Sequence, residues 1–332
     1  MRDSFMNLWS ISVVVPVYNS EEILPDLISR LGKILPNVAK CFEVILVNDG
    51  SSDGSWNAVC NVEAAYPWVR GINLLRNYGQ HNALLCGIRE ARYDLIITID
   101  DDLQNPPEEI PKLLKKLAEG NDVVYGTPEK EQHGFWRDVA SQVTKLALQS
   151  AMGAGTARKV TAFRVFRTKV RDAFANYQSP FVSIDVLLTW GTTKFDAIAV
   201  QHDTRQAGIS NYTFRKLVSH ALNMTTGFST VPLQLASLMG FVFTFFGLVV
   251  LAYVIGRYLI LGYSVPGFPF LASIIAIFSG AQLFALGIIG EYLARMHYRT
   301  MERPPYIVGS RCEGGKSTRS TESLEDDRKT ES

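Results

Sequence analysis

Several absences narrow the function of this 332-residue chain before any motif is considered. No Gly-x-Gly-x-x-Gly follows the first predicted strand, and no Walker A lysine loop occurs, so the two commonest nucleotide-binding patterns of α/β folds are missing. The net charge is only +1, which provides no overall field to attract nucleic acid, and no nucleic-acid partner is expected. We expect no secretion signal, because the apolar run at residues 11–15 is short and ends at Pro16.

Cysteine is scarce. None of the four cysteines has a spacing typical of a disulfide framework or a zinc site. Three of them lie in apolar or helix-like surroundings, which favours reduced thiols in a cytosolic domain. The four are Cys41, Cys60, Cys86 and Cys312.

Charge is missing from two long stretches near the C-terminus, residues 217–256 and 258–290. Each is longer than the roughly 20 residues that a helix needs to cross a hydrocarbon core. The turn-like segment at 262–267 between them predicts a hairpin tip. The sequence therefore predicts two transmembrane helices, at about 231–256 and 268–292; the alternative, a pair of buried soluble helices, is less favoured for uncharged runs of this length.

Basic residues flank the outer ends of this predicted hairpin and predict its orientation. An excess of lysine and arginine marks the cytoplasmic side of a membrane. We therefore expect a multi-pass protein of the cytoplasmic membrane whose soluble domain and both termini face the cytoplasm. The flanking residues are Arg215, Lys216, Arg295, Arg299 and Arg303.

The first 210 residues alternate short β-branched strands with predicted helices, a pattern typical of an α/β domain with a mostly parallel sheet. Apolar residues recur at roughly helical spacing in 211–230, which predicts an interfacial amphipathic helix, with a core-packing helix as the alternative. Two transmembrane helices are expected within 231–296. We expect the remainder, 297–332, to be a cytoplasmic tail that is disordered after about residue 310.

The most informative stretch is Asp100-Asp-Asp-Leu-Gln-Asn-Pro-Pro-Glu108, which directly follows a buried strand. Carboxylates at the carboxyl end of an inner strand lie where α/β folds bind their ligands. Oxygen ligands such as Asp102 and Gln104 suit a hard cation, Mg²⁺ or Mn²⁺, which bridges substrate phosphates. A solvated acidic turn is the plainer interpretation of three adjacent aspartates, but the preceding strand and the following prolines favour a metal site.

Other polar residues are candidates for binding a nucleotide or a phosphate. Tyr18 has a ring that stacks on a base and Asp49 a carboxylate that accepts hydrogen bonds from a base edge, although an aspartate in such a loop is more often a turn residue. Arg137 and Ser141 lie four residues apart, hence on one helical face, and suit an anion. Arg205, with Gly208 and Ser210, suits a phosphate.

Five motifs in this order resemble glycosyltransferase family 2, in the branch of dolichol-phosphate mannose synthases and bacterial polyisoprenyl-phosphate glycosyltransferases. The C-terminal hairpin, with Gly287-Ile-Ile-Gly-Glu-Tyr292, is most similar to the undecaprenyl-phosphate members. The resemblance covers about residues 9–308. The motifs are Pro16-Val-Tyr-Asn-Ser-Glu21, Val47-Asn-Asp-Gly-Ser-Ser-Asp53, Asn77-Tyr-Gly79, the acidic stretch from Asp100 to Glu108, and Arg205-Gln-Ala-Gly-Ile-Ser210.

This resemblance implies a GT-A fold and a role for each matching residue. Pro16, Tyr18, Glu21 and Asp49 would line the nucleoside pocket, and Asp100 would contact the ribose side of the donor. Asp102 and Gln104 would hold the metal. The lipid phosphate would be gripped by Arg137 and Ser141, and Arg205 would close over the donor phosphates, so that Asp100, Asp102 and Arg205 form the catalytic set.

The resemblance also implies the reaction: metal-dependent, inverting transfer of a sugar from a nucleotide-sugar, with UDP favoured, to a polyprenyl phosphate such as undecaprenyl phosphate. The sequence departs from the family pattern at two places where the family binds phosphate. Pro128 lies in a segment that often contains a basic residue, and Asn211 stands where a lysine is usual. The alternatives are a processive polysaccharide synthase, which would carry a Gln-x-x-Arg-Trp motif that is missing here, and a non-catalytic nucleotide-binding membrane adaptor. A homo-oligomer is left open.

Overall fold

The computed structural model describes residues 9–128, 160–203, 231–261, 267–301, 303–313 and 316–319. The chain divides into two compact units. The first comprises residues 1–213 together with 303–332, and the second comprises residues 214–302. The first unit thus contains chain from both sides of the second.

The first unit is built on a nine-stranded sheet with the order β7-β5-β6-β4-β1-β2-β3-β8-β9. The pairs β1–β2, β1–β4, β2–β3 and β5–β7 are parallel, whereas β6 runs antiparallel to β4 and β5. The predicted mostly parallel sheet is confirmed. The strands are β1 (Ser10–Val17), β2 (Cys41–Asn48), β3 (Val69–Leu74), β4 (Leu95–Thr98), β5 (Val123–Pro128), β6 (Arg164–Arg167), β7 (Phe195–Val200), β8 (Val308–Glu313) and β9 (Lys316–Arg319).

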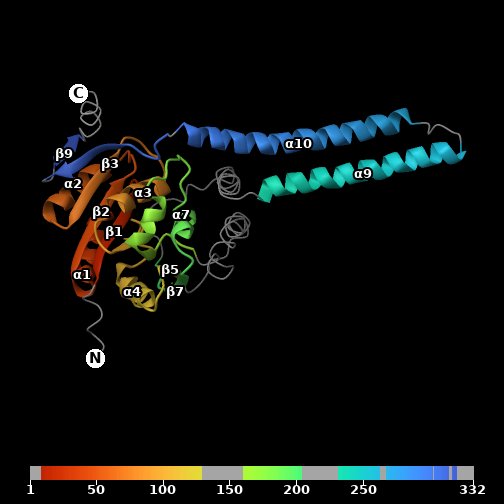
Figure 1. The fold of residues 1–332 in the computed structure, drawn as a ribbon. Coiled ribbons are helices and arrows are strands. Elements are labelled where there is room, and N and C mark those ends of the chain that lie inside the picture. The colour runs from red at the N-terminus through yellow and green to blue at the C-terminus, as the bar shows by residue number, and fades with distance from the viewer. Residues whose placement is uncertain are drawn as a thin grey trace, which may run out of the picture. The chain divides into compact units, whose positions relative to one another are not determined.

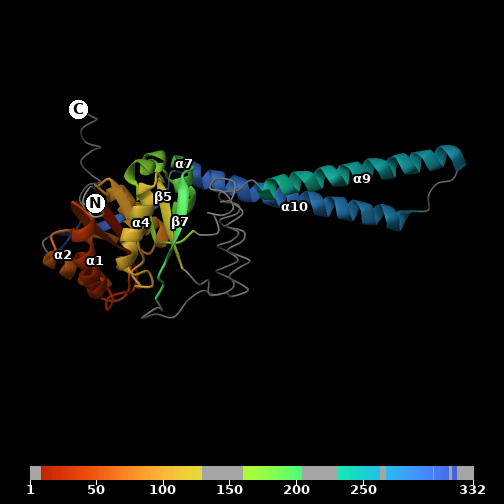
Figure 2. The same ribbon diagram turned by 90° about the horizontal axis from the view of Figure 1, so that it is seen from below.

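Helices cover both faces of this sheet (Figures 1 and 2). One hydrophobic core joins it to α1 (Leu24–Val38), α2 (Ser55–Ala65) and α4 (Ile110–Ala118). A second core on the other face joins it to α3 (Gln80–Glu90), α7 (Ile184–Gly191) and the 3₁₀ helix η3 (Thr168–Phe174). A short 3₁₀ turn, η2 (Pro107–Glu109), precedes α4. Because inner parallel strands are buried on both faces, they appear in the sequence as unbroken apolar runs.

The C-terminal segment returns to the sheet, which corrects the prediction of disorder after about residue 310 as far as Arg319, the last described residue. Strand β8 pairs antiparallel with β3, and β9 pairs with β8 at the sheet edge (Figure 1). The sequence of this tail consists largely of serine, threonine and residues of both charges, and it shows no apolar periodicity that would predict a strand. An edge strand, however, requires only a row of backbone hydrogen bonds, and the outer edge of β3 provides that row.

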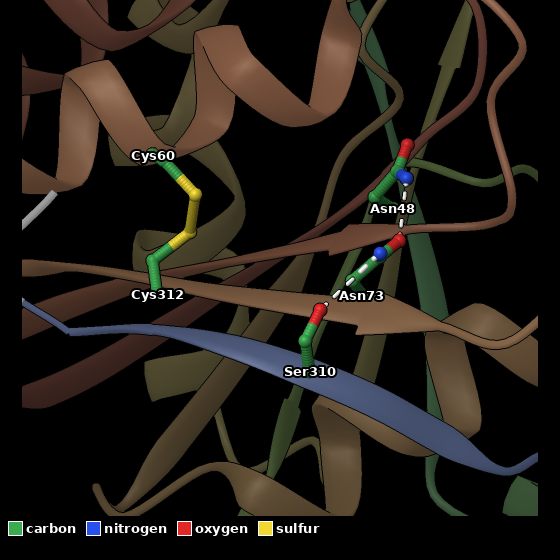
Figure 3. The surroundings of a disulfide bond; sticks show 5 residues. All are labelled: Asn48, Cys60, Asn73, Ser310 and Cys312. Carbon is green, nitrogen blue, oxygen red and sulfur yellow. Dashed lines mark hydrogen bonds between the residues drawn. A yellow bond between two sulfur atoms is a disulfide. The ribbon is translucent and has the colours of Figure 1, made fainter. Parts of the chain in front are cut away.

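A disulfide joins Cys60 of α2 to Cys312 of β8, so the prediction of reduced thiols is wrong for this pair (Figure 3). The two residues are 252 positions apart, and only the pairing of β8 with β3 brings their Cα atoms to 5.5 Å. Figure 3 also shows the Asn73 side chain bridging Asn48 and Ser310 by hydrogen bonds. Cys41 and Cys86 are free thiols, as predicted.

The second unit contains two long helices, α9 (Val231–Leu261) and α10 (Phe268–Thr300), which lie side by side (Figures 1 and 2). Phe243 and Phe278 pack edge to face between them, with ring centroids 5.7 Å apart. The segments 236–257 and 277–294 have mean hydropathies of 2.5 and 1.4 and are long and apolar enough to cross a membrane. The two predicted apolar helices are confirmed, whereas the predicted interfacial helix at 211–230 lies outside the described residues.

Candidate active site

The loops that follow β1, β2 and β4 meet at one edge of the sheet. Register fixes this arrangement, because β1 lies between β2 and β4 and runs parallel to both. Parallel strands present their carboxyl ends to the same edge, which is where α/β folds bind ligands. The acidic stretch and the loops that carry Tyr18 and Asp49 are therefore neighbours, as the sequence predicted.

Asp101, the middle residue of the acidic triplet, holds the loop after β1. Its Oδ2 accepts hydrogen bonds from the backbone N–H of Tyr18, at 3.1 Å, and from the hydroxyl of Ser20. Sequence reasoning assigned no role to Asp101.

Asp100 receives a hydrogen bond from the start of α3, where Gln80 Nε2 donates to its Oδ1 at 2.6 Å. Although Asp100 keeps some solvent exposure, burial and the neighbouring Asp102 and Asp101 carboxylates raise its pKa to about 7. The positive charge of Arg164 and the Gln80 hydrogen bond oppose this rise in pKa. The site therefore concentrates negative charge, which a cation would neutralise.

Arg164 is fully buried below the acidic triplet, with 1% of its surface exposed. It lies opposite Thr98 in the β4–β6 register, and its Nε donates to the Thr98 hydroxyl at 3.1 Å. Its Nη1 pairs with Asp185 in the first turn of α7, and the Tyr125 hydroxyl donates to the same carboxylate oxygen. Thr98 directly precedes Ile99 and Asp100, so this network supports the end of β4.

The segment from Asp102 to Gln104 forms a tight turn. Leu103 has a φ of +57°, a left-handed conformation that is rare for leucine, and its side chain is buried in the core. The backbone N–H of Gln104 donates to Asp102 Oδ1 at 3.1 Å. Core packing of Leu103 thus stabilises a turn that keeps the two predicted metal ligands next to each other.

The four predicted nucleoside-pocket residues lie within β1, after β1 and after β2, and two of them hold loops. Buried Asp49 accepts hydrogen bonds from the backbone N–H groups of Tyr78, at 2.7 Å, and Gly79, at 2.8 Å; burial raises its pKa, whereas these hydrogen bonds lower it. Glu21 accepts a hydrogen bond from the N–H of Gly54 at 3.0 Å. The other two side chains differ in exposure, since that of Tyr18 is half exposed and Pro16 is buried within β1.

The segment after β7 is fixed to the acidic turn. Asp203 N donates to the backbone carbonyl of Gln104 at 2.9 Å, and Gln201 N donates to the Glu109 carboxylate at 3.2 Å. Asp203, the last described residue of this segment, therefore lies beside a predicted metal ligand. The remaining predicted site residues, Arg205, Arg137 and Ser141, lie outside the described residues.

Sequence comparison finds relatives of this chain. Residues 12–178 match the family described as Glycosyl transferase family 2. The chain is 36% identical over 304 residues to the undecaprenyl-phosphate 4-deoxy-4-formamido-L-arabinose transferase of Pectobacterium carotovorum, covering 90% of this chain and 92% of the relative. The enzyme of the same name from Proteus mirabilis is 36% identical over 310 residues, covering 92% and 94%.

Solved structures resemble the first unit. The glucosyl-3-phosphoglycerate synthase of Mycobacterium tuberculosis, crystallised with Mn²⁺ and UDP-glucose, has a TM-score of 0.51 at 16% identity, covering 68% of this chain and 79% of that one. The mannosyl-3-phosphoglycerate synthase of Rubrobacter xylanophilus has a TM-score of 0.50 at 16% identity, covering 65% and 72%. At such identities the likeness shows the fold alone, and it confirms the predicted GT-A architecture.

Proposed function

The chain belongs to glycosyltransferase family 2, and from this premise we propose that it transfers a sugar from a nucleotide-sugar to a polyprenyl phosphate at the membrane. One observation carries the proposal: the relatives at 36% identity, whose names specify undecaprenyl phosphate, align with 90% of this chain. The alignment with these relatives therefore extends beyond residues 12–178, the part that matches the family. Undecaprenyl phosphate is the acceptor that we propose.

The donor binds at the carboxyl edge of the sheet, and UDP is the favoured nucleotide. Tyr18 presents an exposed ring beside the loop that contains Asp49, which suits stacking on a base. Asp100, the first residue of the acidic stretch, is the proposed acceptor of hydrogen bonds from the ribose hydroxyls. The UDP-glucose complex of the mycobacterial synthase, which has the same fold, supports the choice of UDP.

Mg²⁺ or Mn²⁺ is the proposed cofactor, held by Asp102 and Gln104. The concentration of carboxylates that raises the Asp100 pKa fits a cation at this place. Among the described residues, however, no three His, Cys, Asp or Glu side chains gather to form a complete metal site. Mg²⁺ commonly takes few protein ligands and completes its shell with substrate phosphates and water, so the described residues supply part of the shell. When bound, the ion neutralises charge on the departing diphosphate.

The reaction requires no base. A lipid phosphate oxygen is already ionised near neutral pH, and it attacks the anomeric carbon in line while the bond from that carbon to the diphosphate oxygen breaks. The products are a lipid-linked sugar with inverted anomeric configuration and the free nucleoside diphosphate. Asp185, a buried carboxylate near this edge, is paired with Arg164 and Tyr125, which agrees with a mechanism that removes no proton.

The other residues in the proposed mechanism lie outside the described part of the chain. Arg137 and Ser141 bind the lipid phosphate, and Arg205 stabilises the diphosphate as it departs. The guanidinium of Arg205 would stabilise charge that develops only as the donor bond breaks.

Chain connectivity supports the proposed membrane topology. Strands β1 to β7 precede the two apolar helices, and β8 follows them, yet all these strands belong to one sheet. A chain that crosses the bilayer twice returns to its starting side, as this connectivity requires. Arginine and lysine at the outer ends of the helix pair favour the cytoplasm as that side.

The test uses the full-length protein in nanodiscs with undecaprenyl phosphate, a panel of radiolabelled nucleotide-sugars and Mg²⁺ or Mn²⁺. Formation of a labelled lipid, abolished by EDTA and restored by the metal, is the expected result. Asp102→Ala should lose at least about 100-fold in kcat/KM while keeping its melting temperature, because a contact to the metal and diphosphate is lost. Full activity in this variant would remove the metal role, and nucleotide binding without transfer would favour the adaptor.

A further inference from the structure

Gln80 connects two parts of the site that lie far apart in the sequence. It is the first residue of α3, and its exposed side chain reaches the acidic turn to donate to Asp100 Oδ1 at 2.6 Å. A hydrogen bond to a carboxylate is stronger than one between neutral groups. The contact therefore fixes one of the two Asp100 oxygens and with it the rotation of the carboxylate.

The backbone on either side of Gln80 is itself held in place. Asp49 accepts hydrogen bonds from the N–H groups of Tyr78 and Gly79, immediately before the helix begins. Gly79 has a φ of +95°, a conformation that favours glycine, and this sharp turn starts α3. Asn82 Nδ2 donates to the Tyr78 carbonyl at 2.6 Å. Gln80 therefore extends from a rigid start of the helix, which makes it an effective support for another side chain.

These contacts form a continuous connection from β2 to β4. It runs from Asp49 through the backbone of Tyr78 and Gly79 to Gln80 and then to Asp100. In the proposed function Asp49 belongs to the base end of the donor site, and Asp100 to its ribose end. The connection therefore spans the part of the site that receives the nucleoside.

We propose that Gln80 is a positioning residue for the donor nucleotide, which holds Asp100 in the orientation that binds the ribose. The inference rests on the proposed function and names a residue beyond the predicted set. Gln80 acts through Asp100 and does not itself contact the donor. Without the amide, Asp100 is repelled by Asp101 and Asp102 and turns away, because no other hydrogen bond from the described part of the chain fixes its Oδ1.

The experiment measures binding of UDP with Mn²⁺ by calorimetry, and the donor and acceptor KM values, on the full-length protein. Gln80→Ala should weaken UDP binding by about 10-fold, the effect of losing one charge-assisted hydrogen bond. It should raise the donor KM and leave the acceptor KM unchanged, a split that a general loss of structure would not produce. Asn37→Ala is the matched control, because it removes an exposed amide from α1 that donates only to the Lys33 carbonyl.

A double-mutant cycle with Asp100→Asn separates positioning from direct contact. If Gln80 acts through Asp100, adding Gln80→Ala to Asp100→Asn should change UDP affinity and donor kcat/KM by less than about twofold. Independent, additive losses would show that Gln80 contacts the donor, and they would overturn the inference. Wild-type UDP affinity in Gln80→Ala would overturn it as well. Failure of the wild-type protein to bind UDP would instead contradict the proposed donor.

Discussion

Arg164 and Asp185 form an ion pair that is shielded from water below the acidic turn. The guanidinium also bonds to Thr98, two residues before Asp100, and its charge lowers the Asp100 pKa. Because burying two charges requires removing their hydration, such a pair adds little stability compared with apolar side chains. Its placement under three carboxylates indicates an electrostatic function in the site.

Removing one partner of this pair should destabilise the protein more than removing both charges. Arg164→Met leaves the Asp185 charge buried and unpaired, which typically costs about 3–5 kcal/mol. The double variant Arg164→Met/Asp185→Asn keeps an acceptor for Tyr125 and should recover most of the loss in melting temperature. Arg167→Met, on the same strand, is the control, because Arg167 is partly exposed and its ion pair is screened. A double variant no more stable than Arg164→Met would contradict this account.

Thiol counting tests the disulfide. Native protein should react at Cys41 alone, because Cys86 is fully buried and burial raises its pKa to about 12. Denaturation should expose Cys86 as a second reactive thiol, and denaturation with a reductant should expose all four. Quantification with a chromogenic thiol reagent, with Cys41→Ser as the control, distinguishes these states. Four thiols in denatured protein without reductant would show that Cys60 and Cys312 are unpaired.

The stability of the β8 edge should depend on pH through Glu90. Its carboxylate accepts paired hydrogen bonds from Arg311 of β8 and a further one from Arg70, and the bonds and charge of Arg311 contribute most to lowering its pKa. A lowered pKa stabilises the fold above the unfolded-state value of about 4.3, and this contribution disappears as the pH falls through the lower folded value. Glu90→Gln should therefore cost about 1–2 kcal/mol at pH 7 and progressively less below about pH 4.

Urea unfolding of wild type and Glu90→Gln between pH 3 and pH 7 measures this difference. Glu119→Gln is the control, because Glu119 pairs with Lys116 on the surface, where an ion pair contributes little. If the difference in unfolding free energy between wild type and Glu90→Gln were the same at pH 3 as at pH 7, the change in side-chain shape, and not the lost charge, would explain the effect of the substitution.

The sequence predicted those parts of the fold that local patterns determine. The two predicted apolar helices are α9 and α10, and the acidic turn lies at the carboxyl edge of the sheet. Ser20, which acidic residues follow, has the local pattern of a helix N-cap, but its hydroxyl bonds to Asp101 and the Tyr18 carbonyl, and α1 begins at Leu24. Hydrogen bonding across loops took priority over a local capping pattern.

Contacts between distant segments were beyond sequence reasoning. The pairing of β8 with β3 joins residues more than two hundred positions apart, and no periodicity in the tail marks it. The disulfide depends on that pairing, and the Gln80–Asp100 hydrogen bond depends on where α3 begins. One sequence feature could have indicated a role for Gln80: it carries a side-chain amide and follows a strand at the edge of the sheet that binds ligands.

The late position of β8 in the chain determines the order in which the enzyme is completed. As the ribosome elongates the chain, β3 emerges long before β8, so the outer edge of β3 stays unpaired until α9 and α10 have been made. Synthesis of both apolar helices thus precedes closure of the sheet. A fragment that stops before Val231 would expose this edge to aggregation, whereas splicing residues 303–319 directly after residue 213 would supply the missing strands.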